Sequence, residues 1–362
     1  MGGYLIVAGE VSGDYYAAQV AEKLKEYNPE FLCGLGGEAL EKAGVSIWEN
    51  PLDRSTFGVK GAVGNLFFLL ALARRTARRA EGMGIKKALL VDSSGFNMYL
   101  GSLLRRRGIE VLHYIPPGVW FWGRWRAGFL ARRGIKVACI FPQEADIYRD
   151  FGVETHYVGH PLAQELTPVV KKEKDLIAVL PGSRTQELKD ILPVMAKAVA
   201  ILKQKKPELR FILARAPGLA GELFQPAREA GIEIVEGKTR EITGQAALAL
   251  AASGTVTLES ALLGTPLVIV YHTDRLTFWL GKRMARVDSI GLPNLVLGER
   301  FLPELLQEDF TAQNLAEAAI EILKPDRYRE VLEKLSRVQS MLELEDTPGR
   351  VAELLAAGRR ET

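Results

Sequence analysis

The sequence contains few residues of the types that build disulfide frameworks or metal centres. Its 362 residues include two cysteines and four histidines. Cys33 and Cys139 follow no motif spacing, which indicates no disulfide framework and favours a reducing compartment. The histidines also lack metal-ligand spacing; they are His113, His156, His160 and His272. We therefore expect no disulfide scaffold and no resident metal ion.

Long hydrophobic runs are also absent. The longest, residues 66–73 (LFFLLALA), is far shorter than the roughly 20 apolar residues that a membrane-spanning helix needs. The first three residues lead directly into an apolar run at 4–8, so no signal peptide is expected. A hydrophobic content of 48% with 25% charged residues fits one or two globular domains with sizeable cores. These features favour a cytoplasmic protein.

Positive charge is concentrated in one region although the net charge is only +3. Residues 60–136 contain 15 Lys and Arg against three acidic residues. The same region contains the apolar run 66–73 and the aromatic stretch 120–126 (WFWGRWR). Basic residues mixed with Trp, Phe and Leu favour a peripheral contact with an anionic membrane. A core beside solvated charges is the alternative, and nucleic acid is disfavoured because no nucleic-acid-binding module pattern accompanies the charge.

Short apolar runs alternate with helical periodicity along most of the chain. The predicted strands are residues 4–8, 31–35, 88–91, 111–114, 137–140, 155–158, 176–180, 211–214, 232–235, 246–252 and 267–271. The predicted helices are residues 14–27, 66–79, 98–106, 191–203, 255–263, 311–323, 326–342 and 348–357. The polar stretch 166–175 (LTPVVKKEKD) is the best linker candidate. The pattern predicts an α/β chain with two parallel-sheet domains facing a cleft, residues 1–165 and 166–345.

Two strand-to-helix turns in the second half have the composition of phosphate sites. Residues 253–255 (SGT) follow the run 246–252, and residues 181–184 (PGSR) follow another apolar run. Backbone N–H groups and the dipole at a helix start favour an anion, and Arg184 suits bidentate phosphate recognition. Glu259 lies one turn after the first site, where a carboxylate can accept hydrogen bonds from ribose hydroxyls. An ordinary capped helix and a solvated arginine are the alternatives.

Eight motifs together resemble the lipid-A-disaccharide synthase family, of which the chain is identified as a divergent member. They are residues 9–14 (GEVSGD), 34–37 (GLGG), Asp92 with Phe96-Asn97, 119–122 (VWFW), 158–162 (VGHPL), 180–184 (LPGSR), 253–255 (SGT) and 292–295 (LPNL). Their order and spacing match from residue 4 to about residue 324. The resemblance implies a GT-B glycosyltransferase of family 19 with two Rossmann-like domains. It also implies that C-terminal helices cross back, with residues 346–362 packing on the first domain.

The resemblance implies an inverting transfer of 2,3-diacylglucosamine from UDP to 2,3-diacylglucosamine 1-phosphate. The product would be the β-1,6-linked lipid A disaccharide 1-phosphate, with UDP in the C-terminal domain and the acceptor lipid in the N-terminal domain. No cofactor or metal is expected, and the absence of any Asp-x-Asp agrees with this. The expected location is the cytoplasmic face of the inner membrane, on its anionic leaflet. The oligomeric state stays open, with a homodimer among the candidates.

The turns and the resemblance together give three groups of expected site residues. The donor nucleotide is assigned to Gly182, Ser183, Arg184, Ser253, Gly254, Thr255, Thr257, Leu258, Glu259 and Asn294. The acceptor is assigned to Ser12, Gly13, Phe96, Asn97, Trp120 and Trp122. The general base is expected among Glu10, Asp92 and Asp14, which are carboxylates in strand-end turns of the first domain. The alternatives are structural: a helix cap for Asp14, a buried hydrogen-bonding role for Asp92, and core packing for the tryptophans.

The motifs on the acceptor side depart from the family pattern. The family usually has Asp-x-Pro-Asp before Phe-Asn, and its second aspartate is a favoured base, but Gly95 stands at that position here. Residues 116–118 (PPG) replace a Ser-Pro-Ser-type lead, and Phe57 stands where Met is common. The donor-side motifs are intact. This contrast favours a retained donor with a different base or a different glycolipid acceptor; a non-catalytic UDP-sugar- or lipid-binding homologue is a further alternative.

Overall fold

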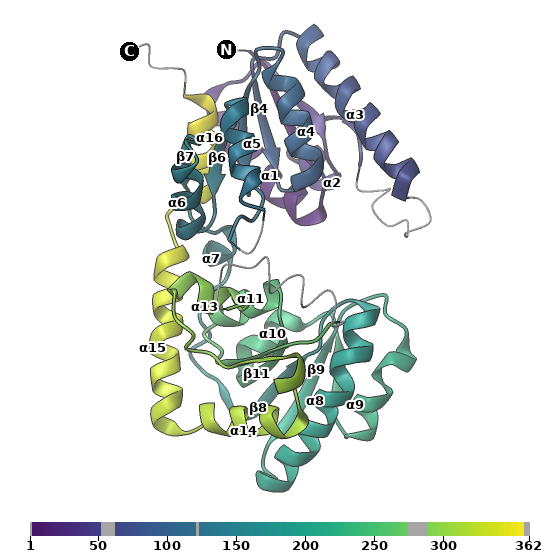
Figure 1. Ribbon diagram of the computed structural model, residues 1–362, viewed down its shortest axis with the longest axis vertical. Helices are drawn as coiled ribbons and strands as arrows, with labels where there is room; N and C mark the ends of the chain where they lie inside the picture. The colour runs from purple at the N-terminus through teal and green to yellow at the C-terminus, as the bar shows by residue number, and fades with distance from the viewer. Residues whose placement is uncertain (1, 52–61, 121–122, 274–288, 358–362) are drawn as a thin grey trace. The chain divides into compact units, whose positions relative to one another are not determined.

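The computed structural model of the chain describes residues 2–51, 62–120, 123–273 and 289–357. It divides into two compact units (Figure 1). The first unit combines Met1–Pro161 with Leu344–Thr362, and the second is Leu162–Glu343. Trp122 and Phe57 lie outside the described residues.

The first unit is a seven-stranded sheet with the order β3-β2-β1-β4-β5-β6-β7, and all of its pairs are parallel. The strands are β1 Tyr4–Ala8, β2 Leu32–Leu35, β3 Ser46–Glu49, β4 Lys87–Val91, β5 Glu110–Tyr114, β6 Lys136–Cys139 and β7 Thr155–Tyr157. The helices are α1 Val11–Leu24, α2 Glu38–Lys42, α3 Ala62–Gly82, α4 Ser94–Arg105, α5 Trp125–Arg133, α6 Pro142–Asp150 and α16 Thr347–Ala356.

The second unit is a six-stranded parallel sheet with the order β10-β9-β8-β11-β12-β13. The strands are β8 Glu173–Leu180, β9 Arg210–Arg215, β10 Glu233–Glu236, β11 Ala246–Ala252, β12 Leu267–Tyr271 and β13 Glu304–Leu306. The helices are α8 Thr185–Lys205, α9 Gln225–Glu229, α10 Thr239–Gln245, α11 Thr255–Leu262, α13 Leu292–Leu297, α14 Ala312–Ile322 and α15 Pro325–Leu342, with α7 Pro161–Glu165 at the junction.

The central strands are buried along their whole length, as parallel strands covered by helices on both faces must be. All residues of β1 (YLIVA) and β11 (AALALAA) are buried, and both strands have the bounds that the sequence predicts. The prediction for 166–175 is partly wrong, because β8 begins inside this stretch at Glu173. Likewise, the helix predicted from residue 14 begins a turn earlier, at Val11, since the Asp14 N–H already donates to the Glu10 carbonyl at 2.8 Å.

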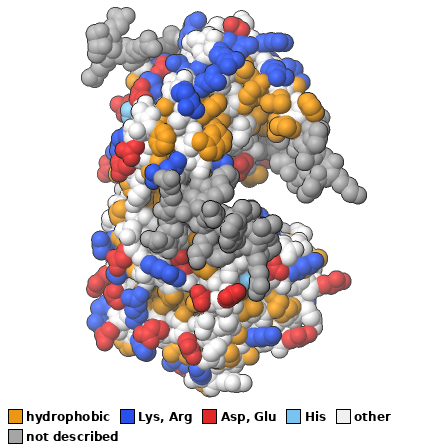
Figure 2. Space-filling model, viewed as in Figure 1, with side chains coloured by type: hydrophobic (Ala, Val, Ile, Leu, Met, Phe, Trp, Pro, Cys, Tyr) orange, Lys and Arg blue, Asp and Glu red, His pale blue; other side chains and the backbone are white. Residues whose placement is uncertain are grey.

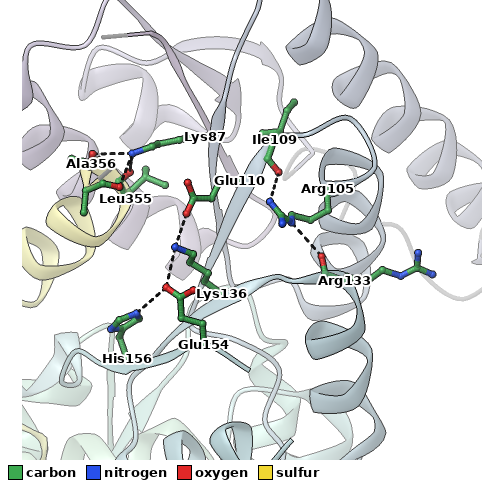
Figure 3. Close-up of polar contacts among 11 residues, drawn as sticks. Lys87, Arg105, Ile109, Glu110, Arg133, Lys136, Glu154, His156, Leu355 and Ala356 are labelled. Atoms are coloured by element: carbon green, nitrogen blue, oxygen red, sulfur yellow. Dashed lines mark hydrogen bonds and ion pairs between the residues drawn. The ribbon is translucent and has the colours of Figure 1, made fainter. Parts of the chain in front are cut away.

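The last helix completes the first unit. Helix α16 packs on α1 and contacts β4 and β5; it is the yellow helix beside the early elements in Figure 1. Lys23 pairs with Asp346 at 3.1 Å, and Lys87 donates to the carbonyls of Leu355, Ala356 and Ala357 at the other end of α16. Figure 3 shows this Lys87 contact at the start of β4. No described helix is both long and apolar enough to cross a bilayer.

Candidate functional site

A cavity of about 680 Å³ opens at the carboxyl ends of the strands of the second sheet. Three strand-to-helix turns line it, after β8, β10 and β11. The lining residues include Gly182, Ser183, Arg184, Glu187, Gly237, Lys238, Thr239, Arg240, Glu241, Ser253, Gly254, Thr255, Val256 and Glu259. Ligands of parallel α/β sheets bind at this edge, because the helix starts that follow the strands point their N–H groups toward it.

The turn after β11 leaves its helix start without a side-chain cap. Helix α11 begins at Thr255, and no side-chain cap hydrogen bond is present at Gly254. Gly254 and Thr255 are exposed, and Ser253 is half-buried with its N–H donating to Val270. The first N–H groups of a helix have no partner within the helix, so an anion can bind here.

The turn after β8 is arranged differently, because a carboxylate of its own helix already occupies it. Glu187 accepts hydrogen bonds from the N–H groups of Ser183 and Arg184, at 3.1 and 3.3 Å, and lies 3.2 Å from Arg184 Nη1. Gly182 has φ of 105°, and a Cβ atom there would lie 2.4 Å from Glu187 Oε2. The glycine therefore allows both the turn and this contact. The Arg184 side chain is 83% exposed and remains the group of this turn that can reach a ligand.

The turn after β10 adds two cations that are not among the site residues expected from the sequence. Lys238 and Arg240 both line the cavity, and each pairs with a carboxylate of the same cavity. Lys238 lies 3.3 Å from Glu241, and Arg240 donates to Glu259 at 2.8 and 3.1 Å. The signal was present as the tetrapeptide 237–240 (GKTR) after a predicted strand.

A second constellation lies in the first unit, at the ends of the neighbouring strands β1 and β4. Glu10 precedes α1, and Asp92 with Ser93 forms the turn into α4. Asp92 and Ser93 are both left-handed, with φ of 52° and 46°. Consecutive left-handed non-glycine residues cost of the order of 1–3 kcal/mol each and gather at functional sites. This turn therefore supports the acid/base interpretation of the sequence.

The electrostatics of this turn favour proton uptake. Desolvation raises the pKa of Glu10, and the neighbouring Asp92 carboxylate raises it further. Burial also raises the pKa of Asp92, opposed by the Ser93 N–H, which donates to its carboxylate at 2.8 Å. A base whose pKa moves up from the carboxylate range toward neutrality is a better proton acceptor.

Two polar residues expected in this site are instead engaged in building the turns. Both Asp14 oxygens accept backbone hydrogen bonds, from Gly37 at 2.6 Å and Ala39 at 3.0 Å. Asp14 is 4% exposed and lies inside α1, which has no side-chain cap, so it does not cap its own helix; its carboxylate instead binds the start of α2. Asn97 is fully buried and donates to the carbonyls of Val91 and Asp92. Asn97 therefore fixes the backbone of the Asp92 turn through these two hydrogen bonds.

The sequence matches a family model described as lipid-A-disaccharide synthetase over residues 4–351. It is 32% identical over 364 residues to a lipid-A-disaccharide synthase of Coxiella burnetii, with 97% of each chain covered. It is also 33% identical to that of Syntrophus aciditrophicus, covering 96% of this chain and 95% of the relative. The chain belongs to the lipid-A-disaccharide synthase family. As a member it is a glycosyltransferase of lipid A disaccharide synthesis.

Solved structures agree on the fold. A UDP-GlcNAc 2-epimerase from Neisseria meningitidis, bound to UDP-GlcNAc, matches 98% of this chain and 99% of its own with a TM-score of 0.65 at 11% identity. The calicheamicin glycosyltransferase CalG4 matches all of this chain and 99% of its own with a TM-score of 0.62 at 13% identity. At such low identity these likenesses show the fold alone. This family member has the GT-B fold, two Rossmann-like parallel-sheet domains.

The structure distributes the expected donor residues of this lipid-A-disaccharide synthase family member unevenly. The cavity is lined by Gly182, Ser183, Arg184, Ser253, Gly254, Thr255 and Glu259. Thr257, Leu258 and Asn294 are buried and do not line it. Thr257 Oγ1 donates to the Gly254 carbonyl, and Asn294 bonds Leu302 and Glu304, so we correct these two assignments to roles that shape the surrounding backbone, and that of Leu258 to core packing.

On the acceptor side, Trp120 is 6% exposed and packs edge-on against Phe141 at 4.6 Å between ring centroids. It therefore belongs to the core of the first unit, which corrects the expected contact with substrate. Ser12 is exposed and Phe96 half-buried, near the Glu10 and Asp92 turns in sequence. Gly13 is buried beside the Asp92 turn, where a Cβ atom would lie 3.4 Å from the Asp92 Cβ, an ordinary van der Waals contact.

Proposed function

We propose that this enzyme transfers 2,3-diacylglucosamine from UDP to 2,3-diacylglucosamine 1-phosphate with inversion. The products would be the β-1,6-linked lipid A disaccharide 1-phosphate and UDP. The observation that supports this most is the cavity of the second unit, where the uncapped start of α11 and the exposed Arg184 side chain come together in a chain of this family. We assign donor binding to the second unit and proton removal to the first.

Departure of UDP places negative charge on the diphosphate, and the cavity has groups to accept it. The start of α11 at Thr255 offers N–H groups and the positive end of the helix dipole, and Arg184 offers an exposed cation. Glu259 would bind the ribose. This arrangement needs no metal ion, and we propose a metal-independent reaction. The uridine nucleotide in the Neisseria epimerase structure supports the same use of this fold.

The acceptor hydroxyl must lose a proton as it attacks the donor carbon. Glu10 or Asp92 would take this proton, since the family carboxylate is replaced by Gly95. Their raised pKa values suit this role. Ser12 and Phe96 are proposed to contact the acceptor.

Lipid substrates require access to a membrane, and the first unit has a suitable surface. Leu66, Phe67 and Trp125 are 54, 69 and 62% exposed, with exposed arginines on the same helices α3 and α5. Figure 2 shows Lys and Arg side chains beside hydrophobic ones on the visible face of the first unit. We propose that the protein works on the anionic cytoplasmic leaflet of the inner membrane, with α3 and α5 as its contact.

Mass spectrometry of the products tests the proposed reaction. Incubation with UDP-2,3-diacylglucosamine and 2,3-diacylglucosamine 1-phosphate should give the disaccharide 1-phosphate and UDP without added metal. Arg184→Ala should weaken UDP binding roughly tenfold or more in calorimetry, because a charged hydrogen bond to phosphate contributes about 1.5–3 kcal/mol. Arg228→Ala, which removes an arginine outside the cavity lining, should leave UDP affinity unchanged. Equal UDP affinities of both variants and the parent would remove Arg184 from the donor site.

The replacement of the family carboxylate by Gly95 favours one alternative, a different glycolipid acceptor with the same donor. A panel of acylated sugar acceptors would then give product where 2,3-diacylglucosamine 1-phosphate does not. Turnover of the donor with another acceptor, and none with 2,3-diacylglucosamine 1-phosphate, would support this alternative over the main proposal.

A further inference from the structure

Arg240 holds one oxygen of the Glu259 carboxylate at the wall of the cavity. Its Nε and Nη2 atoms donate to the same oxygen, Oε1, at 3.1 and 2.8 Å. Arg240 is the second residue of α10, and Glu259 lies in α11, so the contact joins the turns after β10 and β11. Both residues line the cavity.

The guanidinium is anchored on another side as well. Its Nη1 atom lies 3.6 Å from Oε2 of Glu165, the last residue of α7. The Arg240 side chain is 49% exposed, whereas those of Glu165 and Glu259 are 19 and 18% exposed. A guanidinium presents its donors in one rigid plane, so two carboxylates fix its orientation. Glu165 thereby stabilises the orientation in which Arg240 meets Glu259.

The other oxygen of Glu259, Oε2, accepts no hydrogen bond from any residue that the structure describes. An ionised carboxylate has acceptor capacity on both oxygens. Fixing Oε1 therefore leaves Oε2 in a set position at the cavity wall, ready for a hydroxyl donor. In addition, the Arg240 charge offsets that of Glu259, which reduces repulsion of a diphosphate in the same cavity.

We propose that Arg240 is a positioning residue, which orients Glu259 so that Oε2 accepts a hydrogen bond from a ribose hydroxyl of the donor nucleotide. This rests on the proposed binding of UDP in the cavity. Arg240 itself need not touch the nucleotide. It would act through Glu259. Its loss should therefore remove the recognition of one ribose hydroxyl, and not simply lower the affinity for every ligand.

Lys238 provides a matched control from the same turn. It carries the same charge and lines the same cavity, but it pairs with Glu241 at 3.3 Å and not with Glu259. Lys238→Ala removes a cation from the cavity and leaves the Arg240–Glu259 contact in place. A general loss of positive charge and a specific loss of positioning can thus be separated.

The experiment is calorimetry of the full chain with UDP, 2′-deoxy-UDP and 3′-deoxy-UDP. The parent should bind UDP roughly tenfold more tightly than at least one deoxy analogue, since a hydrogen bond to a charged group is lost. Arg240→Ala should reduce this ratio to about threefold or less, and Arg240→Lys should reduce it too, because a single ammonium does not reproduce the fork. Lys238→Ala should lower the affinity for all three nucleotides and leave the ratio of UDP affinity to deoxy-analogue affinity unchanged.

The outcomes separate this inference from the function on which it rests. If the parent binds UDP but does not distinguish the deoxy analogues, or if Arg240→Ala and Arg240→Lys keep the parent ratio, the positioning role is overturned and the donor site stands. If the parent does not bind UDP at all, the proposed function and this inference both fail. Unchanged thermal unfolding of each variant confirms that the ratios come from folded protein.

Discussion

Glu10 and Asp92 are the residues of the first unit whose charge the proposed reaction needs most directly. Glu10→Gln and Asp92→Asn keep side-chain size and most hydrogen bonding but remove the negative charge. Loss of a general base costs about 10²–10⁴-fold in rate, so one of the two should lower kcat by that amount. We favour Glu10, because it is exposed while Asp92 is partly buried and bonded to the Ser93 N–H. Turnover of the disaccharide reaction at pH 7, with circular dichroism of each variant, is the measurement.

Asp14→Asn is the control for this pair, because the Asp14 carboxylate is occupied by two backbone N–H groups. It should lower stability more than kcat. Normal turnover of both Glu10→Gln and Asp92→Asn would show that the base lies elsewhere.

Gly95 allows the converse experiment. A Cβ atom at this position would meet no atom within 4 Å, so Gly95→Asp introduces the family carboxylate without a clash. Activity on 2,3-diacylglucosamine 1-phosphate should rise if the position still faces this acceptor, and Gly95→Asn should not produce the rise because it lacks the charge. Unchanged activity of Gly95→Asp would indicate that the base has been replaced completely.

At the same scale, sequence reasoning found the cavity residues that follow an apolar strand directly, such as Arg184 and Ser253. It did not find Arg240 or Glu187, because their importance depends on a partner. Arg240 contributes by holding Glu259, which is 19 residues away in the chain. Glu187 contributes by accepting a hydrogen bond from the Ser183 N–H. Composition signals a cation or a carboxylate, but only the packed helices show which groups already satisfy one another.

At the scale of elements, the end of helix α16 is held by a side chain that lies about 270 residues earlier in the chain, Lys87. The Lys87 ammonium lies 2.8, 2.8 and 2.9 Å from the three carbonyls at the end of α16 (Figure 3). A cation stabilises the end of a helix, where carbonyls lack partners within the helix. Lys87→Met should therefore cost about 1–3 kcal/mol and lower the Tm by about 2–4 °C per kcal/mol.

Hydrogen exchange measured on α16 distinguishes this contact from a general effect. Amides of residues 347–356 should exchange faster in Lys87→Met than in the parent. Lys86→Met removes the neighbouring exposed lysine and should change neither the exchange nor the Tm. Identical exchange of α16 in all three proteins would mean that Lys87 does not fasten the helix.

The elements themselves were predictable where burial is complete. The residues of β11 are all buried, so their sequence is a continuous apolar run with sharp ends. Two of the four edge strands, β7 and β10, were predicted, but the other two were missed: β3 (SIWE) is half-exposed, and β13 (ELL) has only three residues. Neither has a periodicity that separates it from a loop. Helix α10, with seven residues, was missed for the same reason.

At the scale of the whole molecule, basic charge and exposed apolar side chains predict reversible membrane binding. Co-sedimentation with phosphatidylglycerol-containing vesicles should be strong at low salt and fall as salt rises, because each basic residue at an anionic surface contributes about 1 kcal/mol. Phosphatidylcholine vesicles should retain far less protein. The double variant Phe67→Ser with Trp125→Ser should bind more weakly than the parent, because it loses the exposed apolar groups of α3 and α5.

Val170→Ser is the matched control, since Val170 is 97% exposed and lies in the second unit. It should bind vesicles like the parent. Equal retention by neutral and anionic vesicles, or an unaffected double variant, would show that this surface is only a solvated face.

The packing of α16 on α1 also has a consequence for biosynthesis. The first unit contains both ends of the chain, while residues 162–343 form the second. A ribosome adds about 5–20 residues per second, so roughly 10–40 s separate the emergence of Pro161, where the first unit is interrupted, from that of the helix that covers α1. During this interval the nascent chain presents an unfinished first unit while its second unit is already being made. A stop codon shortly before residue 347 would thus leave that unit permanently open and expose the nascent product to chaperones and proteases.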